Sequence, residues 1–185
     1  MHNVLTLWFQ YIIAKECKGE CFLVVYADDF IAGFQYPWEA ERFYEQLRSR
    51  MAKFGLELEE NKSRIVESGR YLASLKAKRG ESTRLGTFDF LGFTFYCGRT
   101  TKGNPWIMPK TSSKKFRQKV KEIKIWLYNN KEQKLGKLMY MLNVKLVGHY
   151  RYYGISFNSR MISNYKQQVR ELLYKVLTVS YTHLT

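Results

Sequence analysis

Two adjacent carboxylates, Asp28 and Asp29, are the residues whose type and spacing most directly suggest chemistry. They follow a continuous apolar run, 21–25, and precede a second short one, 30–34. This pattern predicts a β-hairpin with buried strands and two acids at its tip. Such a pair offers the hard oxygen ligands that Mg²⁺ prefers, and a bound cation would relieve the repulsion between the charges. Aspartate also favours ordinary turns, so the pair alone leaves both a metal site and a polar turn open.

The charge of the chain is distributed unevenly. The 185 residues carry a net charge of +15, but residues 1–60 hold 6 Lys and Arg against 10 Asp and Glu, whereas residues 61–185 hold 25 against 6. A basic part interleaved with aromatic residues attracts a polyanion whose bases can stack. No apolar stretch reaches the roughly 18–20 residues that span a bilayer. The predicted partner is therefore a nucleic acid and not a membrane, and hydrophobic residues at 45% argue against wholesale disorder.

Neither the three cysteines nor the three histidines show metal-site spacing. Cys17 and Cys21 have no second ligand pair at the distance that a zinc site needs. We predict that the cysteines are small buried residues of a cytoplasmic protein in a reducing compartment.

The segments around the acid pair predict a β–β–α unit. A helix is expected over 4–14, followed by strands over 21–26 and 30–35. Pro37 suits the first position of a second helix, and Gly55 suits the residue after its end. The apolar positions of this helix recur every three or four residues: they are Ala40, Phe43, Tyr44, Leu47, Met51 and Phe54.

The middle of the chain is predicted to alternate short strands with loops. Strands are expected over 56–58 and 64–66, separated by a polar turn. Residues 68–86 lack clear periodicity and predict a surface loop. The run 88–97 is aromatic on both faces and predicts one strand, with a polar turn over 98–105.

From residue 111 the pattern changes to three amphipathic helices, which suffice for a small bundle. Ser112 or Ser113 can cap the first, the second runs to about 147, and the third covers about 159–177. Their apolar stripes are Phe116, Val120, Ile123 and Leu127; Leu135, Leu138, Met139, Leu142 and Leu146; and Ile162, Tyr165, Val169, Leu172, Leu173 and Val176. We place a domain boundary between 100 and 112.

This ordered set of segments resembles the bacterial group II intron reverse transcriptases, also called intron maturases. The resemblance covers about 4–178. The motifs that carry it are Tyr26-Ala27-Asp28-Asp29-Phe30, the Glu60–Ser63 turn after 56–58, Phe88–Phe93, and the stretch 142–154. The resemblance implies an α+β fold: a partial polymerase palm, an antiparallel sheet with helices on one face, in 1–105. A three-helix thumb bundle, or maturase X domain, would follow in 111–178. We expect 179–185 to be a disordered or artefactual tail.

The resemblance also implies roles for individual residues. Asp28 would be a catalytic Mg²⁺ ligand and Asp29 the second acid of the metal site. Tyr26 and Ala27 would shape the active-site turn, and Lys62 would contact nucleotide or template phosphates.

Further residues are implied to contact nucleic acid. Leu91 and Gly92 would form the primer grip. The predicted RNA- or DNA-binding residues are Arg117, Lys121, Lys124, His149, Tyr150 and Arg151. For the tyrosines of 150–153, a place in the thumb core is favoured over base stacking.

The implied activity is RNA-directed DNA synthesis with Mg²⁺, and the implied partners are intron RNA, RNA template, DNA primer and dNTPs. In this family another catalytic aspartate and the fingers precede the point where this chain begins. Two-metal catalysis needs ligands that hold ions about 3.5–4 Å apart, so we expect the isolated chain to be inactive. The alternatives are a non-catalytic RNA-binding splicing module or a related reverse transcriptase of the retron or diversity-generating type. The stretch 142–154 argues against the last.

Overall fold

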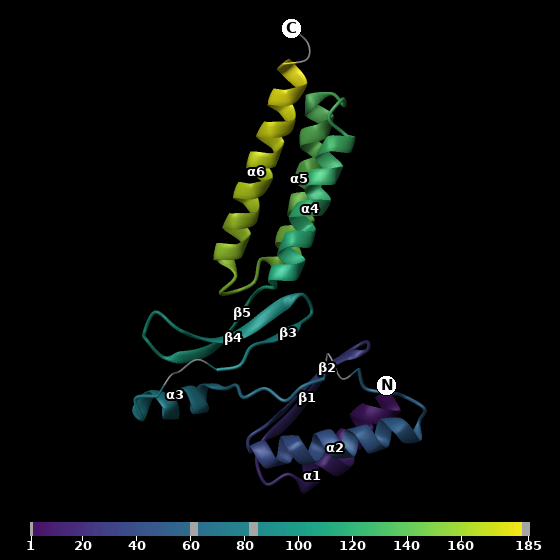
Figure 1. Ribbon diagram of the computed structural model, residues 1–185, viewed down its shortest axis with the longest axis vertical. Helices are drawn as coiled ribbons and strands as arrows, with labels where there is room; N and C mark the ends of the chain where they lie inside the picture. The colour runs from purple at the N-terminus through teal and green to yellow at the C-terminus, as the bar shows by residue number, and fades with distance from the viewer. Residues whose placement is uncertain (1, 60–62, 82–84, 183–185) are drawn as a thin grey trace. The chain divides into compact units, whose positions relative to one another are not determined.

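The computed structural model describes residues 2–59, 63–81 and 85–182, with only the backbone of 2–3 and 179–182 (Figure 1). Two compact units are present, one formed by 1–69 with 84–86 and the other by 70–83 with 87–185. The fold is α+β, as predicted, because both units combine helices with antiparallel strands. The predicted palm–thumb boundary between 100 and 112 concerns family domains and stays a prediction.

The first unit is a β–β–α unit preceded by helical turns, as the sequence predicts. Its elements are η1 (His2–Thr6), η2 (Phe9–Ile13), α1 (Ala14–Glu16), β1 (Cys21–Tyr26), β2 (Asp29–Phe34) and α2 (Pro37–Lys53). β1 and β2 form a two-stranded antiparallel sheet. Pro37 occupies the start of α2, and Gly55 follows its end with a φ of +68°.

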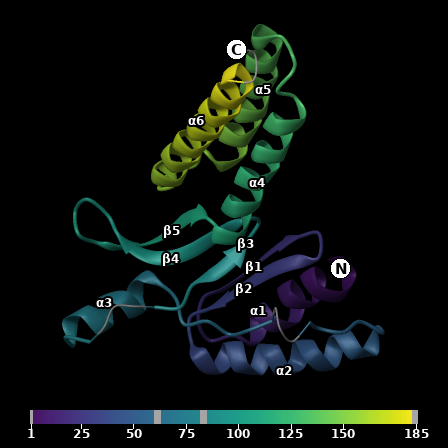
Figure 2. The same cartoon turned by 45° about the horizontal axis from the view of Figure 1, so that its top comes forward.

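The N-terminal helical turns and α2 lie on one face of this hairpin (Figure 2), where the core of the first unit forms. Leu23 and Val25 of β1 pack against a buried cluster whose members are Leu5, Trp8, Phe9, Ile13, Phe43, Leu47 and Met51. The other face is exposed, with Phe22 58% and Tyr26 63% accessible. The prediction of buried strands is therefore only half right. A continuous apolar run does not reveal whether one face or both are covered.

The entry to β1 is fixed by Glu39, a carboxylate of the first turn of α2 that is only 1% exposed. Its Oε1 accepts hydrogen bonds from the backbone N–H groups of Lys18 at 2.6 Å and Gly19 at 3.3 Å. These donors satisfy one carboxylate oxygen, whereas Oε2 is buried without a hydrogen-bond partner among the described residues. Glu39 thus ties the loop before β1 to the helix that covers the hairpin.

Two predictions for the middle of the chain are wrong. The predicted strands over 56–58 and 64–66 are absent from the described residues of 56–67. The sheet of β1 and β2 has only two strands, so these segments have no strand to pair with. Within the predicted loop 68–86 lies a helix, α3 (Arg70–Lys78), whose Ala73 is buried. At nine residues this helix is too short to show clear periodicity, and its contacts with a later strand stabilise it.

The second unit contains a three-stranded antiparallel sheet in the order β3 (Phe88–Phe90), β4 (Phe93–Arg99) and β5 (Pro105–Thr111). The predicted single strand over 88–97 is instead a hairpin that turns at Leu91 and Gly92, which have φ values of +49° and +79°. The predicted polar turn over 98–105 is confirmed for 100–104, while its ends belong to β4 and β5. A leucine at positive φ is uncommon, so the sequence gives no signal for the turn at Leu91.

Three helices complete the second unit and confirm the predicted bundle: α4 (Ser113–Asn129), α5 (Leu135–Tyr153) and α6 (Ser159–Thr182). Ser112 caps α4 by accepting a hydrogen bond from the Lys115 N–H. The core residues are Ile123, Leu127, Leu138, Leu142, Tyr165, Val169 and Val176. Leu135 and Met139 of the predicted stripe instead face outward, 49% and 43% exposed. α6 runs into the stretch for which a tail is predicted, and 183–185 lie outside the described residues.

Candidate metal site and nucleic-acid interface

The two predicted catalytic acids lie at the tip of the β1–β2 hairpin. Tyr26 and Asp29 pair directly across the strands, so Ala27 and Asp28 form a two-residue loop. Ala27 has a φ of +52°. A single positive φ at the first loop position suits a hairpin loop in which glycine is usual. Alanine in the left-handed region costs roughly 1–2 kcal/mol, so the turn that carries the acids is strained.

All four residues of this tip are exposed to solvent. Opposed residues of an antiparallel pair project to the same face, so Asp29 lies beside Tyr26 on the face that the core leaves uncovered. Asp28 projects from the loop itself. The structure thus brings Tyr26, Ala27, Asp28 and Asp29 together at one accessible point, whereas Lys62 lies outside the described residues.

The chemistry of the tip fits part of a magnesium site. Two exposed carboxylates offer oxygen ligands of the kind that Mg²⁺ binds. Among residues 2–59, 63–81 and 85–182, however, no group of three or more His, Cys, Asp or Glu side chains is placed to hold a metal ion. Asp28 and Asp29 can therefore supply ligands, and a complete site needs further ones.

The predicted primer-grip residues occupy the β3–β4 turn, which is tied to the helix bundle. The Tyr152 hydroxyl donates a hydrogen bond to the Leu91 carbonyl oxygen at 2.9 Å, and the Ser112 N–H donates to the Gly92 carbonyl oxygen at 2.9 Å. A Cβ at Gly92 would lie 3.2 Å from the Tyr153 hydroxyl oxygen. The positioning role of Tyr152 was not predictable, because nothing in the local sequence distinguishes this tyrosine from its neighbours.

The predicted basic face of α4 is present and accessible. Arg117, Lys121 and Lys124 are all exposed. The acid of this helix, Glu122, accepts a hydrogen bond from the Lys119 ammonium at 2.8 Å, which lowers the pKa of its carboxyl group. Glu122 is therefore neutralised by Lys119, and the face keeps its positive charge.

His149 is buried and does not lie on this surface, and its predicted role as an RNA contact stays a prediction. Its ring is 9% exposed and stacks on Tyr165 with centroids 3.7 Å apart, and Tyr153 lies 4.7 Å away. Burial, and next the charge of Lys119, lowers the pKa of His149 to about 4. Of the neighbouring predicted contacts, Tyr150 is half-buried against the bundle core and Arg151 is exposed.

Comparison with known families decides the assignment. The family model described as "Reverse transcriptase (RNA-dependent DNA polymerase)" matches residues 1–95, just over half of the chain. The chain belongs to the reverse transcriptase family. A second model, "Group II intron, maturase-specific domain", matches residues 113–184. Together they confirm the predicted family and function, those of a group II intron-encoded reverse transcriptase and maturase.

The two family matches together cover all the predicted site residues of this reverse transcriptase. The hairpin with the aspartate pair and the Leu91–Gly92 turn lie within the polymerase match, and α4 to α6 lie within the maturase match. The maturase-specific match favours the intron enzymes over the retron and diversity-generating types. No curated protein and no solved structure matches the chain.

The cysteines of the reverse transcriptase were predicted to be small buried residues, and no segment was predicted to span a membrane. Cys17, Cys21 and Cys97 are free and half-buried, and burial raises the pKa of the Cys17 thiol to about 11. A thiol with so high a pKa is a poor nucleophile. No described helix of the protein has the length and apolarity needed to cross a membrane.

The burial of His149 predicts that the reverse transcriptase chain loses stability in mild acid. Its pKa is about 4 when folded and about 6.5 when unfolded. Between these values the unfolded chain binds a proton that the folded chain refuses, so stability is full above pH 6.5 and falls as the pH drops. The free energy of unfolding should be about 2 kcal/mol lower at pH 5 than at pH 8.

Urea unfolding of the native chain and of His149→Phe at the two pH values checks this expectation. The variant keeps an aromatic ring but cannot titrate, so its unfolding free energy should change little between pH 8 and pH 5. An equal pH dependence in both proteins would assign the effect to other groups.

Proposed function

We propose that this chain supplies part of the metal site of an RNA-directed DNA polymerase together with a basic surface that binds RNA. The observation that carries the proposal is the exposed Asp28–Asp29 pair at the tip of a strained hairpin, inside the region that matches the polymerase family. The predicted substrates are an RNA template, a DNA primer and dNTPs, and intron RNA is the further partner.

Asp28 and Asp29 are the residues that would hold Mg²⁺. Bound ions of this kind activate the attacking hydroxyl and neutralise charge on the leaving group. The protein's contribution is to keep two carboxylates adjacent, exposed and fixed by the β1–β2 register. Because two neighbouring carboxylates do not complete a two-metal site, we expect the 185-residue chain alone to give no templated dNTP incorporation.

Binding of Mn²⁺ to the 185-residue chain tests the ligand assignment without requiring activity. Paramagnetic Mn²⁺ should first broaden the backbone amide NMR signals of residues 26–29. Asp28→Asn should weaken this broadening severalfold, because it removes one of two charges from the tip. Asp89→Asn, which changes an exposed acid of β3, should leave it intact. Broadening spread evenly over exposed acids would contradict the assignment.

The basic face of α4 is tested by its effect on RNA affinity. Replacing Arg117, Lys121 and Lys124 by glutamate should weaken RNA binding and make it less dependent on salt, since each lost phosphate contact lowers the salt slope by about 1. Fluorescence anisotropy at several KCl concentrations measures both quantities. Lys53→Glu changes an exposed lysine of α2 in the acidic part of the chain and should have little effect.

A second function, assistance of intron splicing by RNA binding alone, is supported by the maturase-specific match. It uses the basic face of the bundle and does not need the aspartate pair. Charge reversal on α4 should therefore impair splicing assistance, whereas Asp28→Asn should not. If Asp28→Asn impaired both splicing and DNA synthesis, the two functions would not be separable in this way.

A further inference from the structure

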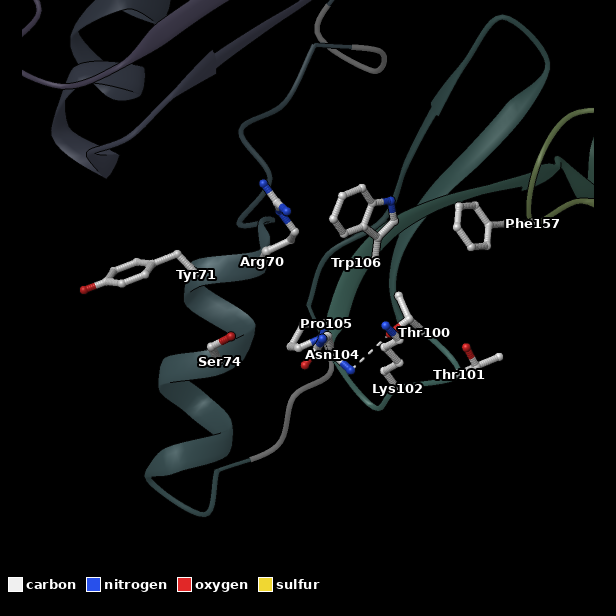
Figure 3. A pocket seen from close by; sticks show the side chains of 10 residues that line it. All are labelled: Arg70, Tyr71, Ser74, Thr100, Thr101, Lys102, Asn104, Pro105, Trp106 and Phe157. Carbon is white, nitrogen blue, oxygen red and sulfur yellow. Dashed lines mark hydrogen bonds between the residues drawn. The ribbon is translucent and has the colours of Figure 1, made fainter.

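An open pocket in the second unit contains none of the predicted site residues (Figure 3). Its walls come from α3, from the β4–β5 hairpin near its turn, and from the loop between α5 and α6. The side chains that matter for its chemistry are Arg70, Lys102, Asn104, Trp106 and Phe157. The pocket therefore combines two cations, an amide and two large aromatic rings.

A cation–aromatic pair forms one wall of the pocket. The guanidinium carbon of Arg70 lies 4.4 Å from the centroid of the Trp106 ring, and that tryptophan is 40% exposed. In the described part of the chain no carboxylate pairs with Arg70. Guanidinium planes and indole rings both stack on nucleic-acid bases. The pair thus presents a stacking surface that keeps its positive charge.

Phe157 supplies a second exposed ring from a strained backbone. Its φ is +69°, a conformation that is a genuine outlier for a bulky side chain, and the ring is 49% exposed. The next residue, Asn158, is fully buried and holds the loop in place through hydrogen bonds to Thr111 and Tyr153. The surrounding structure thus keeps the backbone of Phe157 in a strained conformation, although its large apolar ring remains exposed to water. Such maintained strain suggests a functional role for the ring.

The charged side chains that line the pocket, Arg70 and Lys102, are both basic. Residues 70–111 contain eight Lys and Arg against two Asp and Glu. A polyanion fits this balance better than a protein surface of mixed charge. In a duplex the faces of the bases are covered by their neighbours, whereas an unpaired base can stack on an aromatic side chain. The rings therefore favour single-stranded over double-stranded nucleic acid.

We propose that this pocket binds an unpaired nucleotide of single-stranded RNA, with Trp106 and Phe157 contacting the base and Arg70 and Lys102 contacting phosphate. Asn104 lies at the pocket wall, where its side-chain amide can hydrogen-bond a base edge. The backbone N–H of Asn104 donates to the Thr100 hydroxyl at 3.2 Å, which orders the turn that carries Lys102. The pocket shares no residue with the aspartate pair or with the α4 face.

Anisotropy titrations of the 185-residue chain with a fluorescent 12-nucleotide oligouridylate test this site. Trp106→Ala should weaken binding by about tenfold, the effect typical of losing one base-stacking ring. Trp106→Phe should retain most of the affinity. The affinity of a 12-base-pair RNA duplex should change less than twofold in both variants.

Trp38→Ala is the matched control. Trp38 is 44% exposed and also has an arginine over its ring, Arg42 at 5.7 Å, but it lies on α2 in the acidic part of the chain. Its replacement should leave oligouridylate affinity unchanged. Equal losses for Trp38→Ala and Trp106→Ala would overturn the proposal, because they would show a general aromatic effect.

Phe157→Gly separates a binding role from a structural one. Glycine adopts a positive φ without strain, so the thermal midpoint should stay within a few degrees while oligouridylate affinity falls severalfold. If both Phe157→Gly and Trp106→Ala kept the native affinity for the oligouridylate, the proposal that the pocket binds a nucleotide would be overturned. If charge reversal on α4 still weakened duplex binding, that result would leave the proposed function standing.

Discussion

Replacing Asp28 by asparagine is expected to lower RNA-templated DNA synthesis by on the order of a thousandfold in an active polymerase with this sequence. Metal-assisted charge stabilisation is worth several kcal/mol, and each 1.36 kcal/mol is a factor of ten in rate. Asparagine keeps the size of the side chain and one acceptor oxygen but removes the negative charge. Because Asp28 is an exposed loop residue, the hairpin itself should fold normally.

The comparison variants make this result specific. Asp29→Asn should cause a smaller loss, since Asp29 belongs to β2 and pairs with Tyr26, away from the apex of the loop. Asp89→Asn changes an exposed acid of β3 and should leave synthesis near normal. RNA affinity should be unchanged in all three variants. If Asp28→Asn kept substantial synthesis, or lost RNA binding in parallel, the assignment of Asp28 as a metal ligand would fail.

The elements that the sequence predicted correctly are those with strong local signals. The β1–β2 hairpin follows from two apolar runs that flank a polar pair. α2 follows from Pro37, an apolar stripe at helical spacing and Gly55. The three helices of the bundle are long enough for their periodicity to be clear, and Ser112 marks the start of the first. None of these signals requires knowledge of distant contacts.

The errors occurred where tertiary contacts decide the structure. The turn at Leu91 places a leucine at positive φ, which the hydrogen bond from Tyr152 to the Leu91 carbonyl helps to stabilise from 61 residues away. α3 depends on packing against β5, and the segments 56–58 and 64–66 lack the neighbouring strand that their composition would suit. Local propensity cannot supply a partner that is distant in sequence.

The candidate sites, like the helices and strands, were predictable only where the signal is local in the sequence. The aspartate pair was predictable because its two members are adjacent in sequence and sit between two strand signals. The burial of His149 was not predictable, because a basic aromatic run does not reveal which ring faces the core. The pocket of Arg70, Trp106 and Phe157 was not predictable, since three separate elements bring its rings and charges together.

The largest expected loss of stability comes from Asn158→Ala. Asn158 is fully buried, and its side chain accepts a hydrogen bond from the Thr111 N–H at 2.8 Å. It also donates to the Thr111 hydroxyl at 2.8 Å and to the Tyr153 carbonyl oxygen at 2.7 Å. Alanine would leave the N–H and the hydroxyl of Thr111 without these bonds, whereas the Tyr153 carbonyl would keep the hydrogen bond from the Ile155 N–H. Since each unsatisfied group costs about 1–3 kcal/mol, the free energy of unfolding should fall by about 3 kcal/mol.

Urea unfolding measures this change, with Asn143→Ala as the control. Asn143 is exposed on α5, and alanine is the better helix former there, so that variant should be as stable as the native chain or slightly more stable. Asn158→Asp should be at least as damaging as Asn158→Ala, because it removes both donated bonds and buries a charge. A loss below about 0.5 kcal/mol for Asn158→Ala would mean that water replaces the amide and that the network does not hold the α5–α6 loop. The expected loss would instead establish that one amide joins the end of β5 to the loop that carries Phe157.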